Sequence, residues 1–259
     1  MIGKPQTLWD ARAALNFMLG GTGSGLMVAA LFFPSREAFL IGTALVLVAG
    51  GLGAVWLEIG RKLRAVHVFF NPFTSWMSRE ALAAVVLFGL GILALVSRNQ
   101  ELAYMAGAAA AAFLYCQARI LLAAKGIPAW RAPEVVPLIV STGLAEGSGL
   151  ALLFGAPPPL YVFFGLVVMA RAFAWQRYRA AVRAPQLQSA GTVLLRLGSA
   201  VALAAAALAW VAPALAPFAA PLAAAAALAA GWNLKLRLLT RAAIRQDFTL
   251  PHLPVRGTR

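Results

Sequence analysis

The segment at residues 61–80 is the densest polar feature of the sequence and combines basic, aromatic and amide side chains. Such a mixture suits anchoring among lipid headgroups, and it also suits docking a partner protein or the polar head of a quinone. The headgroup role is favoured for Arg61, Lys62 and Arg64. His67 is open between two roles, because an imidazole can hydrogen-bond or protonate a quinone carbonyl near neutral pH and can equally be a solvated interfacial residue.

Two further sets of polar groups lie close to the ends of apolar runs. Asn16 falls about one turn inside the first run, where a side-chain amide usually finds a partner or a ligand. Tyr115 and Arg119 are four residues apart, so they share one face of a helix. The full set around the end of the fourth run is Tyr115, Gln117, Arg119, Trp130 and Arg131.

Ionisable residues inside apolar runs are costly in lipid and therefore deserve a specific explanation. Glu146, Arg171 and Arg196 all occupy such positions. Glu146 and Arg196 are predicted to form a structural ion pair within a helix bundle. A proton path through the same two residues is the alternative, and it is less favoured because the sequence shows no continuous relay.

The elements that must position these residues are long apolar helices. The chain is 62% hydrophobic and 12% charged, whereas soluble domains carry about 25% charged residues. Apolar runs long enough to cross ~30 Å of hydrocarbon recur along it, without the alternation of a membrane barrel. We predict an all-α integral membrane protein with eight spans at 12–33, 38–60, 79–97, 102–124, 134–155, 158–178, 190–212 and 218–239.

The basic residues predict the orientation of these spans. The net charge is +14, but the cations lie between apolar runs, so lipid headgroups rather than nucleic acid are the expected partner. On the side that holds both termini we count eighteen Lys and Arg residues, Lys235 included, against Arg36 and Arg98 on the other side. The positive-inside rule therefore predicts a bacterial inner-membrane protein with both termini in the cytoplasm.

A faint internal repeat divides the chain into two parts. Residues 23–26 read Gly-Ser-Gly-Leu, and the same four residues recur at 147–150, four spans later. Four crossings restore the starting direction, so two parallel four-helix units are predicted within a single membrane domain. The units cover 1–124 and 125–239, followed by a basic tail at 240–259. For the Gly-Ser-Gly runs themselves, close helix packing is the favoured interpretation.

Redox metals are not expected in this chain. Cys116 is the one cysteine, so no thiolate cluster can hold zinc or an iron–sulfur centre. The two histidines, His67 and His252, both fall outside the spans, which argues against a haem held between helices.

Three motifs stand out in the sequence. They are Trp9-Asp10-x-Arg12-Ala13-x-x-Asn16-Phe17 with Gly20-Gly21-Thr22-Gly23, Asn71-Pro72-x-x-Ser75-Trp76-Met77-x-Arg79-Glu80, and Gln117-Ala118-Arg119 with Gly126-Ile127-Pro128-Ala129-Trp130-Arg131. In these motifs the chain resembles the membrane subunits of the polysulfide reductase (NrfD-like) and dimethyl sulfoxide reductase anchor families. The resemblance covers most of the chain, but the motifs that carry it lie between residues 9 and 150.

This resemblance implies a haem-free anchor in a three-subunit oxidoreductase. A molybdopterin subunit would perform substrate chemistry, a ferredoxin-like subunit would carry iron–sulfur clusters, and the anchor would bind ubiquinone or menaquinone in its first half. Relatives can use a histidine of the first helix there, and Asn16 stands at that position here. The expected quinone ligands are Asn16, His67, Tyr115, Gln117 and Arg119, with His67 or Tyr115 as the proton carrier. Residues expected to support the pocket or the partner interface are Trp9, Asp10, Trp76, Arg79, Glu80, Trp130 and Arg131.

Because these residues map to the basic side, the catalytic subunits are expected in the cytoplasm. A cytoplasmic site suits an intracellular substrate such as an acyl-CoA thioester, and a phenylacetyl-CoA-oxidising branch has a similar anchor. Two other functions stay open at this point. One is a secondary transporter with parallel repeats and a binding site at Glu146, and the other is an anchor without bound quinone.

Overall fold

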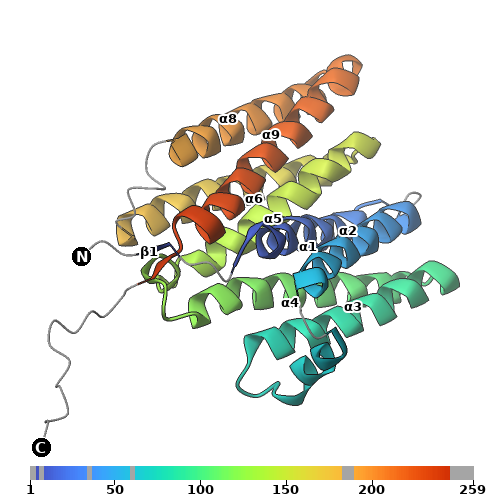
Figure 1. Ribbon diagram of the computed structural model, residues 1–259. Coiled ribbons are helices and arrows are strands. Elements are labelled where there is room, and N and C mark those ends of the chain that lie inside the picture. Colours follow the sequence, from blue (N-terminus) through green and yellow to red (C-terminus); the bar gives the residue numbers. More distant parts are fainter. Residues whose placement is uncertain (1–3, 6–8, 34–36, 59–61, 183–189, 246–259) are drawn as a thin grey trace, which may run out of the picture.

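The computed structural model describes residues 4–5, 9–33, 37–58, 62–182 and 190–245, and these fold into a bundle of long, roughly aligned helices (Figure 1). Eight of the described helices are long and apolar enough to span a membrane, as predicted. The first four are α1 (Ala11–Ala30), α2 (Glu37–Glu58), α3 (Trp76–Ser97) and α4 (Gln100–Ala123). The other four are α5 (Val135–Ala151), α6 (Pro158–Ala181), α8 (Ala190–Val211) and α9 (Ala216–Leu236).

Short elements connect and extend the spans. The segment at 61–80 holds a nine-residue 3-10 helix, η1 (Lys62–Phe70), and Trp76 opens α3, whereas the sequence predicted a start at 79. The reason is the cap at Ser75, whose hydroxyl accepts a hydrogen bond from the Ser78 amide. The remaining short helices are η2 (Pro128–Trp130), η3 (Leu152–Phe154), η4 (Pro213–Leu215) and the π-helix η5 (Arg237–Arg241).

Both described ends of the chain lie on one side of the bundle. A two-residue strand, β1 (Lys4–Pro5), pairs antiparallel with β2 (Ile244–Arg245) and joins the segment before α1 to the segment after α9. We call this side, at the left in Figure 1, the termini side. The tail predicted at 240–259 lies beyond residue 245 for most of its length and is outside the described residues.

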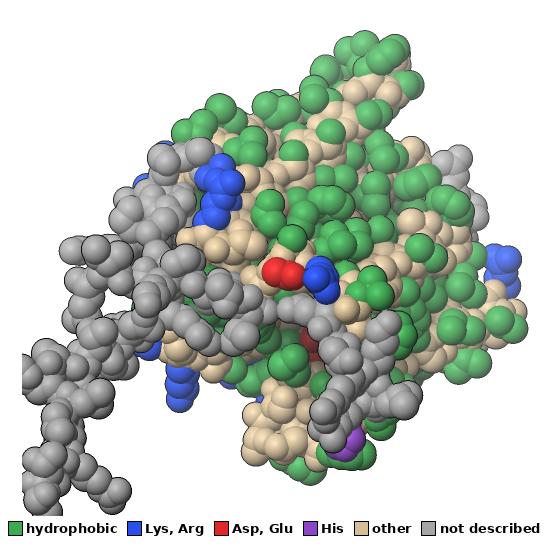
Figure 2. All heavy atoms as spheres, in the orientation of Figure 1, with side chains coloured by type: hydrophobic (Ala, Val, Ile, Leu, Met, Phe, Trp, Pro, Cys, Tyr) green, Lys and Arg blue, Asp and Glu red, His purple; other side chains and the backbone are tan. Residues whose placement is uncertain are grey.

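The helices pack as two sets of four, α1–α4 and α5–α9, which we call the first and second unit. In the first unit, α1 contacts α2 and α4, and α3 contacts α2 and α4; in the second unit, α5 contacts α6 and α9, and α8 contacts α6 and α9. The two units therefore repeat one packing pattern. Figure 2 shows hydrophobic side chains spread over the visible face of the helices, as a lipid-facing surface requires.

Glycines hold the two units together. Gly21 and Gly25 on α1 face Gly143 and Gly147 on α5, so each helix contributes a small-x-x-x-small pair. A Cβ on Gly25 would overlap the carbonyl oxygen of Gly143, and a Cβ on Gly147 would overlap the backbone of Gly25 and Leu26. The backbones of α1 and α5 thus meet directly, and the packing interpretation of the repeated glycines is confirmed.

Candidate functional site

The first unit encloses a small polar cluster within its apolar interior. Asn16 on α1, Glu80 on α3 and Gln117 on α4 are buried, and they lie about 6–9 Å along their helices from the ends on the termini side, at 1.5 Å per residue. The amide Nδ2 of Asn16 donates to Glu80 Oε1 at 3.4 Å, and Gln117 Nε2 donates to the backbone carbonyl of Asn16 at 3.2 Å. We call these three residues the polar cluster.

Two glycines make room for the polar cluster. A Cβ on Gly20 would lie 2.7 Å from Gln117 Nε2, and one on Gly51 would lie 3.1 Å from Asn16 Oδ1. Gly20 therefore lets α4 place its amide against α1, and Gly51 brings α2 to the fourth side of the cluster. Gly20 belongs to one of the sequence motifs, whereas nothing in the sequence distinguishes Gly51 from the other glycines of its span.

The polar cluster has unsatisfied hydrogen-bonding capacity. Asn16 Oδ1 and Gln117 Oε1 are buried and have no hydrogen-bond donor among the described residues. A buried carbonyl oxygen without a donor costs about 1–3 kcal/mol. Two such oxygens beside a buried carboxyl form a place where a ligand with a hydroxyl group would be favourable.

An aromatic and cationic layer lies beside the polar cluster, at the same end of α3 and α4. Trp76 holds the guanidinium carbons of Arg79 and Arg119 at 4.2 and 4.3 Å from its ring. Arg119 donates to the Tyr115 hydroxyl at 2.7 Å, and the Tyr115 ring packs edge-on against Trp76 at 5.8 Å. The structure therefore brings Trp76 and Arg79 of the second motif together with Tyr115 and Arg119 from the set around the end of the fourth run.

Arg79 also fixes the chain that leads into α3. Its Nε and Nη2 donate to the backbone carbonyls of Pro72 and Phe73 at 2.8 and 2.7 Å. The turn before α3 is thereby attached to the aromatic layer. Because Trp76 follows that turn directly, the position of its ring depends on Arg79 through both the stacking contact and the loop.

The other expected site residues lie elsewhere. His67 is exposed on η1 and packs edge-on against Phe70 with ring centroids 5.2 Å apart. Asp10 caps α1 by accepting from the Arg12 amide at 2.7 Å. Trp9 packs 4.9 Å from Trp130, which is fully buried.

Trp130 and Arg131 form part of the structure of the loop between α4 and α5. The indole Nε1 of Trp130 donates to the carbonyl of Leu238 at 3.0 Å, which ties η2 to η5, directly after α9. Arg131 is exposed and donates to the carbonyl of Lys125 within the same loop. Neither residue belongs to the polar cluster or to the aromatic layer.

A fully buried ion pair lies where the two units meet, and its partner was not the one predicted. Glu146 on α5 accepts from Lys235 Nζ on α9 at 2.6 Å and from Thr22 Oγ1 on α1 at 2.9 Å. The predicted pair of Glu146 with Arg196 is wrong: Arg196 is exposed on α8, and α9 rather than α8 packs against α5.

The surroundings of this pair are also polar and buried. Trp232 Nε1 donates to Thr22 Oγ1 at 3.0 Å. Arg171 on α6 is fully buried and donates to Ser199 Oγ at 3.0 Å and to the carbonyl of Ala227 at 3.1 Å. Lys235, which the sequence placed among the cations at the membrane surface, is therefore an interior residue. We call Thr22, Glu146 and Lys235 the central triad.

Comparison with known proteins finds similarity to a subunit of an oxidoreductase. No family model matches the chain. It is 28% identical to a subunit of the sulfite dehydrogenase of Allochromatium vinosum over an alignment of 179 residues that covers 56% of this chain. The match spans about half of the relative's length, 55%. The chain thus has eight helices in its described part that are long and apolar enough to span a membrane, and over part of its length it is similar to a subunit of an oxidoreductase.

Proposed function

We propose that this chain is the membrane subunit through which an oxidoreductase complex exchanges electrons with ubiquinone or menaquinone. The polar cluster is the proposed site for the quinone ring. The observation that carries this proposal is the pair of buried amide oxygens without donors, beside the buried Glu80 carboxyl. The hydroxyl group of a quinol would supply the missing donor, and a quinone carbonyl would accept from the amide groups once the hydrogen is gone.

The chemistry requires a proton acceptor close to the ring. Oxidation of a quinol releases two electrons and two protons, and reduction of the quinone takes them up again. Glu80 is the acidic group within the polar cluster, so we propose that it exchanges one proton with the ring hydroxyl. Tyr115 and His67 remain proposed carriers of protons between this position and the termini side.

We further propose that the electrons pass to or from a ferredoxin-like iron–sulfur subunit bound on the termini side, with a molybdopterin subunit beyond it. The support is positional. The polar cluster and the aromatic layer both lie near that side, so a bound ring would be close to a docked partner. In this proposal the termini side is the cytoplasmic face of the bacterial inner membrane, because the basic residues gather there.

Sulfite is the first substrate to test for the complex. The relative's name gives sulfite as the substrate of its dehydrogenase, and the comparison lends no support to the phenylacetyl-CoA branch. The complex purified through this chain should reduce an artificial dye with sulfite and not with phenylacetyl-CoA. The reverse result would restore the acyl-CoA proposal without affecting the quinone site.

The quinone site itself is tested by two substitutions in the intact complex, with dye-linked activity measured beside quinone-linked turnover. Glu80→Gln should lower quinone-linked turnover by about 10²-fold through loss of a proton-transfer group. Gln117→Leu should weaken quinone affinity by about fivefold, since a hydrogen bond contributes roughly 1 kcal/mol. Dye-linked activity should remain unchanged in both variants, because the electrons then bypass the quinone.

Matched controls exist near the other end of the same unit. Glu101 and Gln100 are exposed at the start of α4, at the end opposite to the termini side, so Glu101→Gln and Gln100→Leu should leave both activities unchanged. Equal effects at the control and cluster positions would contradict the quinone site. A complex that purifies without quinone-dependent turnover would leave only a structural anchor.

His67→Ala tests the proton-carrier prediction in the same assay. If His67 delivers protons to the site, quinone-linked turnover should fall while dye-linked activity stays constant, and added imidazole should restore part of the rate. Unchanged turnover in both assays would remove His67 from the mechanism and leave Glu80 and Tyr115.

A further inference from the structure

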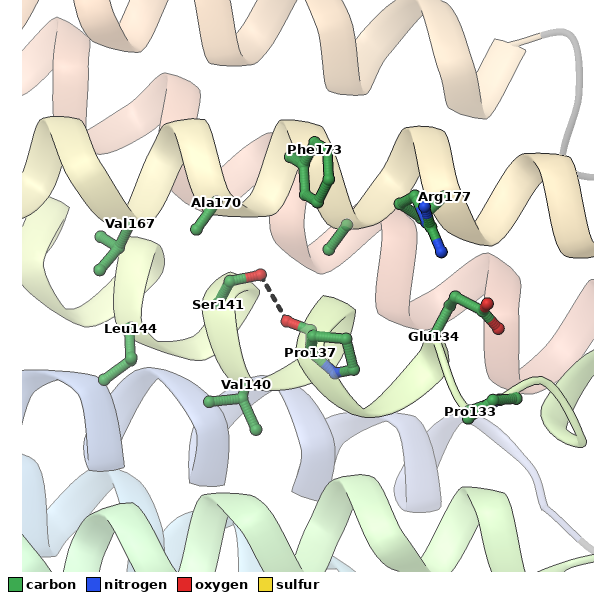
Figure 3. Close-up of a pocket in the computed structure, with 11 residues that line it drawn as sticks. Pro133, Glu134, Pro137, Val140, Ser141, Leu144, Val167, Ala170, Phe173 and Arg177 are labelled. Carbon is green, nitrogen blue, oxygen red and sulfur yellow. Dashed lines mark hydrogen bonds between the residues drawn. The ribbon is translucent and has the colours of Figure 1, made fainter.

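The second unit has a groove between two of its helices. In the first unit α1 and α2 pack together extensively, whereas the corresponding pair, α5 and α6, packs less closely. A groove of about 680 Å³ lies between α5 and α6 (Figure 3). Ala170 and Phe173 along its edge are exposed, so the groove opens on the outer surface of the bundle, toward lipid.

The groove has the length of one membrane leaflet. Its lining runs from Glu134 to Leu144 on one side and from Val167 to Arg177 on the other, ten residue steps each, which corresponds to about 15 Å at 1.5 Å per residue. The hydrocarbon core of a bilayer is about 30 Å thick, so one leaflet contributes about 15 Å. An occupant confined to one leaflet therefore fits, and a long isoprenoid tail that continues past the midplane does not.

The interior of the groove is apolar and its one visible hydroxyl is satisfied. Val140, Leu144 and Val167 line the wall, and Ser141 Oγ donates to the carbonyl of Pro137 at 2.6 Å (Figure 3). An apolar space inside a membrane does not hold ordered water. The apolar walls of the groove therefore favour contact with hydrocarbon, and the bilayer supplies hydrocarbon as lipid acyl chains.

The end of the groove on the termini side carries one charge of each sign. In Figure 3, Glu134 and Arg177 lie together at that end, and Val167 and Leu144 lie at the other. Glu134 Oε2 is buried and has no hydrogen-bond donor among the described residues. A headgroup with both a phosphate and a primary ammonium would satisfy the guanidinium and the carboxylate at the same time.

We propose that this groove binds one phosphatidylethanolamine molecule of the leaflet on the termini side. Its phosphate contacts Arg177, its ammonium contacts Glu134, and one acyl chain lies against Val140 and Val167. An anionic lipid such as phosphatidylglycerol fits less well, because its headgroup has no cation to place beside Glu134. The proposal is independent of the quinone site, which lies in the other unit.

The proposal is tested by one substitution that fills the groove and another that removes the carboxylate at its charged end. The protein is extracted in mild detergent from vesicles of equal phosphatidylethanolamine and phosphatidylglycerol content, and retained lipid is measured by native mass spectrometry. The unmodified chain should retain one phosphatidylethanolamine with a roughly two- to fivefold preference over phosphatidylglycerol, the range expected for a surface ion pair. Ala170→Trp should abolish that retention. Ala170 is exposed, so the bulkier side chain enters the groove without repacking the core.

Matched substitutions complete the experiment. A second, smaller groove of about 270 Å³ between α6 and α8 includes Gly165 and has no charged residue in its lining, so Gly165→Trp should leave phosphatidylethanolamine retention unchanged. Glu134→Gln should bring the two lipids to equal retention. Equal loss in both tryptophan variants, equal retention of the two lipids by the unmodified chain, or quinone displaced by Ala170→Trp in place of phospholipid would each overturn the proposal.

Discussion

At the scale of single residues, the central triad shows how a membrane interior holds charge. Glu146 and Lys235 have no exposed surface, and their 2.6 Å contact is supported by the hydroxyl of Thr22. Either charge alone would be very costly in hydrocarbon, so each is stabilised in the interior by the opposite charge of its partner. The triad takes one residue from each of three helices, α1, α5 and α9, and therefore links the first unit to the second.

Removing one member of the pair should destabilise the protein strongly. Lys235→Met leaves the Glu146 carboxylate buried without its cation, and breaking a buried pair in this way costs about 3–5 kcal/mol. The midpoint of thermal unfolding in detergent should fall clearly. The double variant Glu146→Gln with Lys235→Met should be more stable than the sum of the single effects, because no unpaired carboxylate remains.

Arg196 provides the control for this cycle, because it was the predicted partner. It is exposed on α8 and lies about 9 Å into its helix at 1.5 Å per residue, so its long side chain can reach the membrane surface. Arg196→Met should leave the unfolding midpoint nearly unchanged. A loss as large as that of Lys235→Met would argue that Arg196 also supports Glu146.

At the scale of helices, the contact between α1 and α5 depends on glycine. Gly147→Ala places a methyl group against the backbone of Gly25, so α1 and α5 must move apart, and overpacking of this kind costs about 1–3 kcal/mol. Gly42→Ala on α2 is the matched control, since nothing lies within 4 Å of its added Cβ. That change should stabilise the protein by about 0.5–1 kcal/mol, because alanine favours the helix. Unfolding midpoints that shift alike in both variants would contradict direct backbone packing.

The sequence predicts where each helix lies along the chain far better than it predicts which face of each helix packs against its neighbours. Each of the eight predicted spans matches a described helix, because hydrophobic length is a local property. The partner of Glu146 is not local. Arg171, Arg196 and Lys235 all lie in later spans, and the choice among them depends on which helix packs against α5 and on which face.

The polar cluster also shows that contacts between distant helices depend on helix rotation. Asn16 and Gln117 were predicted as ligands of one site, and the structure places them in contact although they are 101 positions apart. Glu80 was predicted only as support, and its place between them depends on the rotation of α3. His67 stood out in the sequence because histidine is scarce, yet the scarcity of a residue type does not indicate how far that residue lies from the polar cluster.

At the scale of the whole molecule, the two units share a packing pattern but differ in what they carry. The first unit holds the polar cluster between all four of its helices. The second unit has the open groove between α5 and α6, and the central triad lies between the units. A repeated framework therefore provides two different environments, a buried polar one within the helices and an open apolar one at their surface.

The sidedness of the molecule decides where its partners can bind, and reporter insertions can measure it. A reporter that is active only outside the cytoplasm should be silent when inserted between Lys125 and Gly126, in the loop on the termini side. It should be active between Arg98 and Asn99, where α3 turns into α4 on the opposite side. The expectation rests on the eighteen cations counted on the termini side, of which Lys235 is interior, so seventeen can act at the surface. Activity at the first position and silence at the second would place the polar cluster near the outer face, and the iron–sulfur partner would then have to bind there.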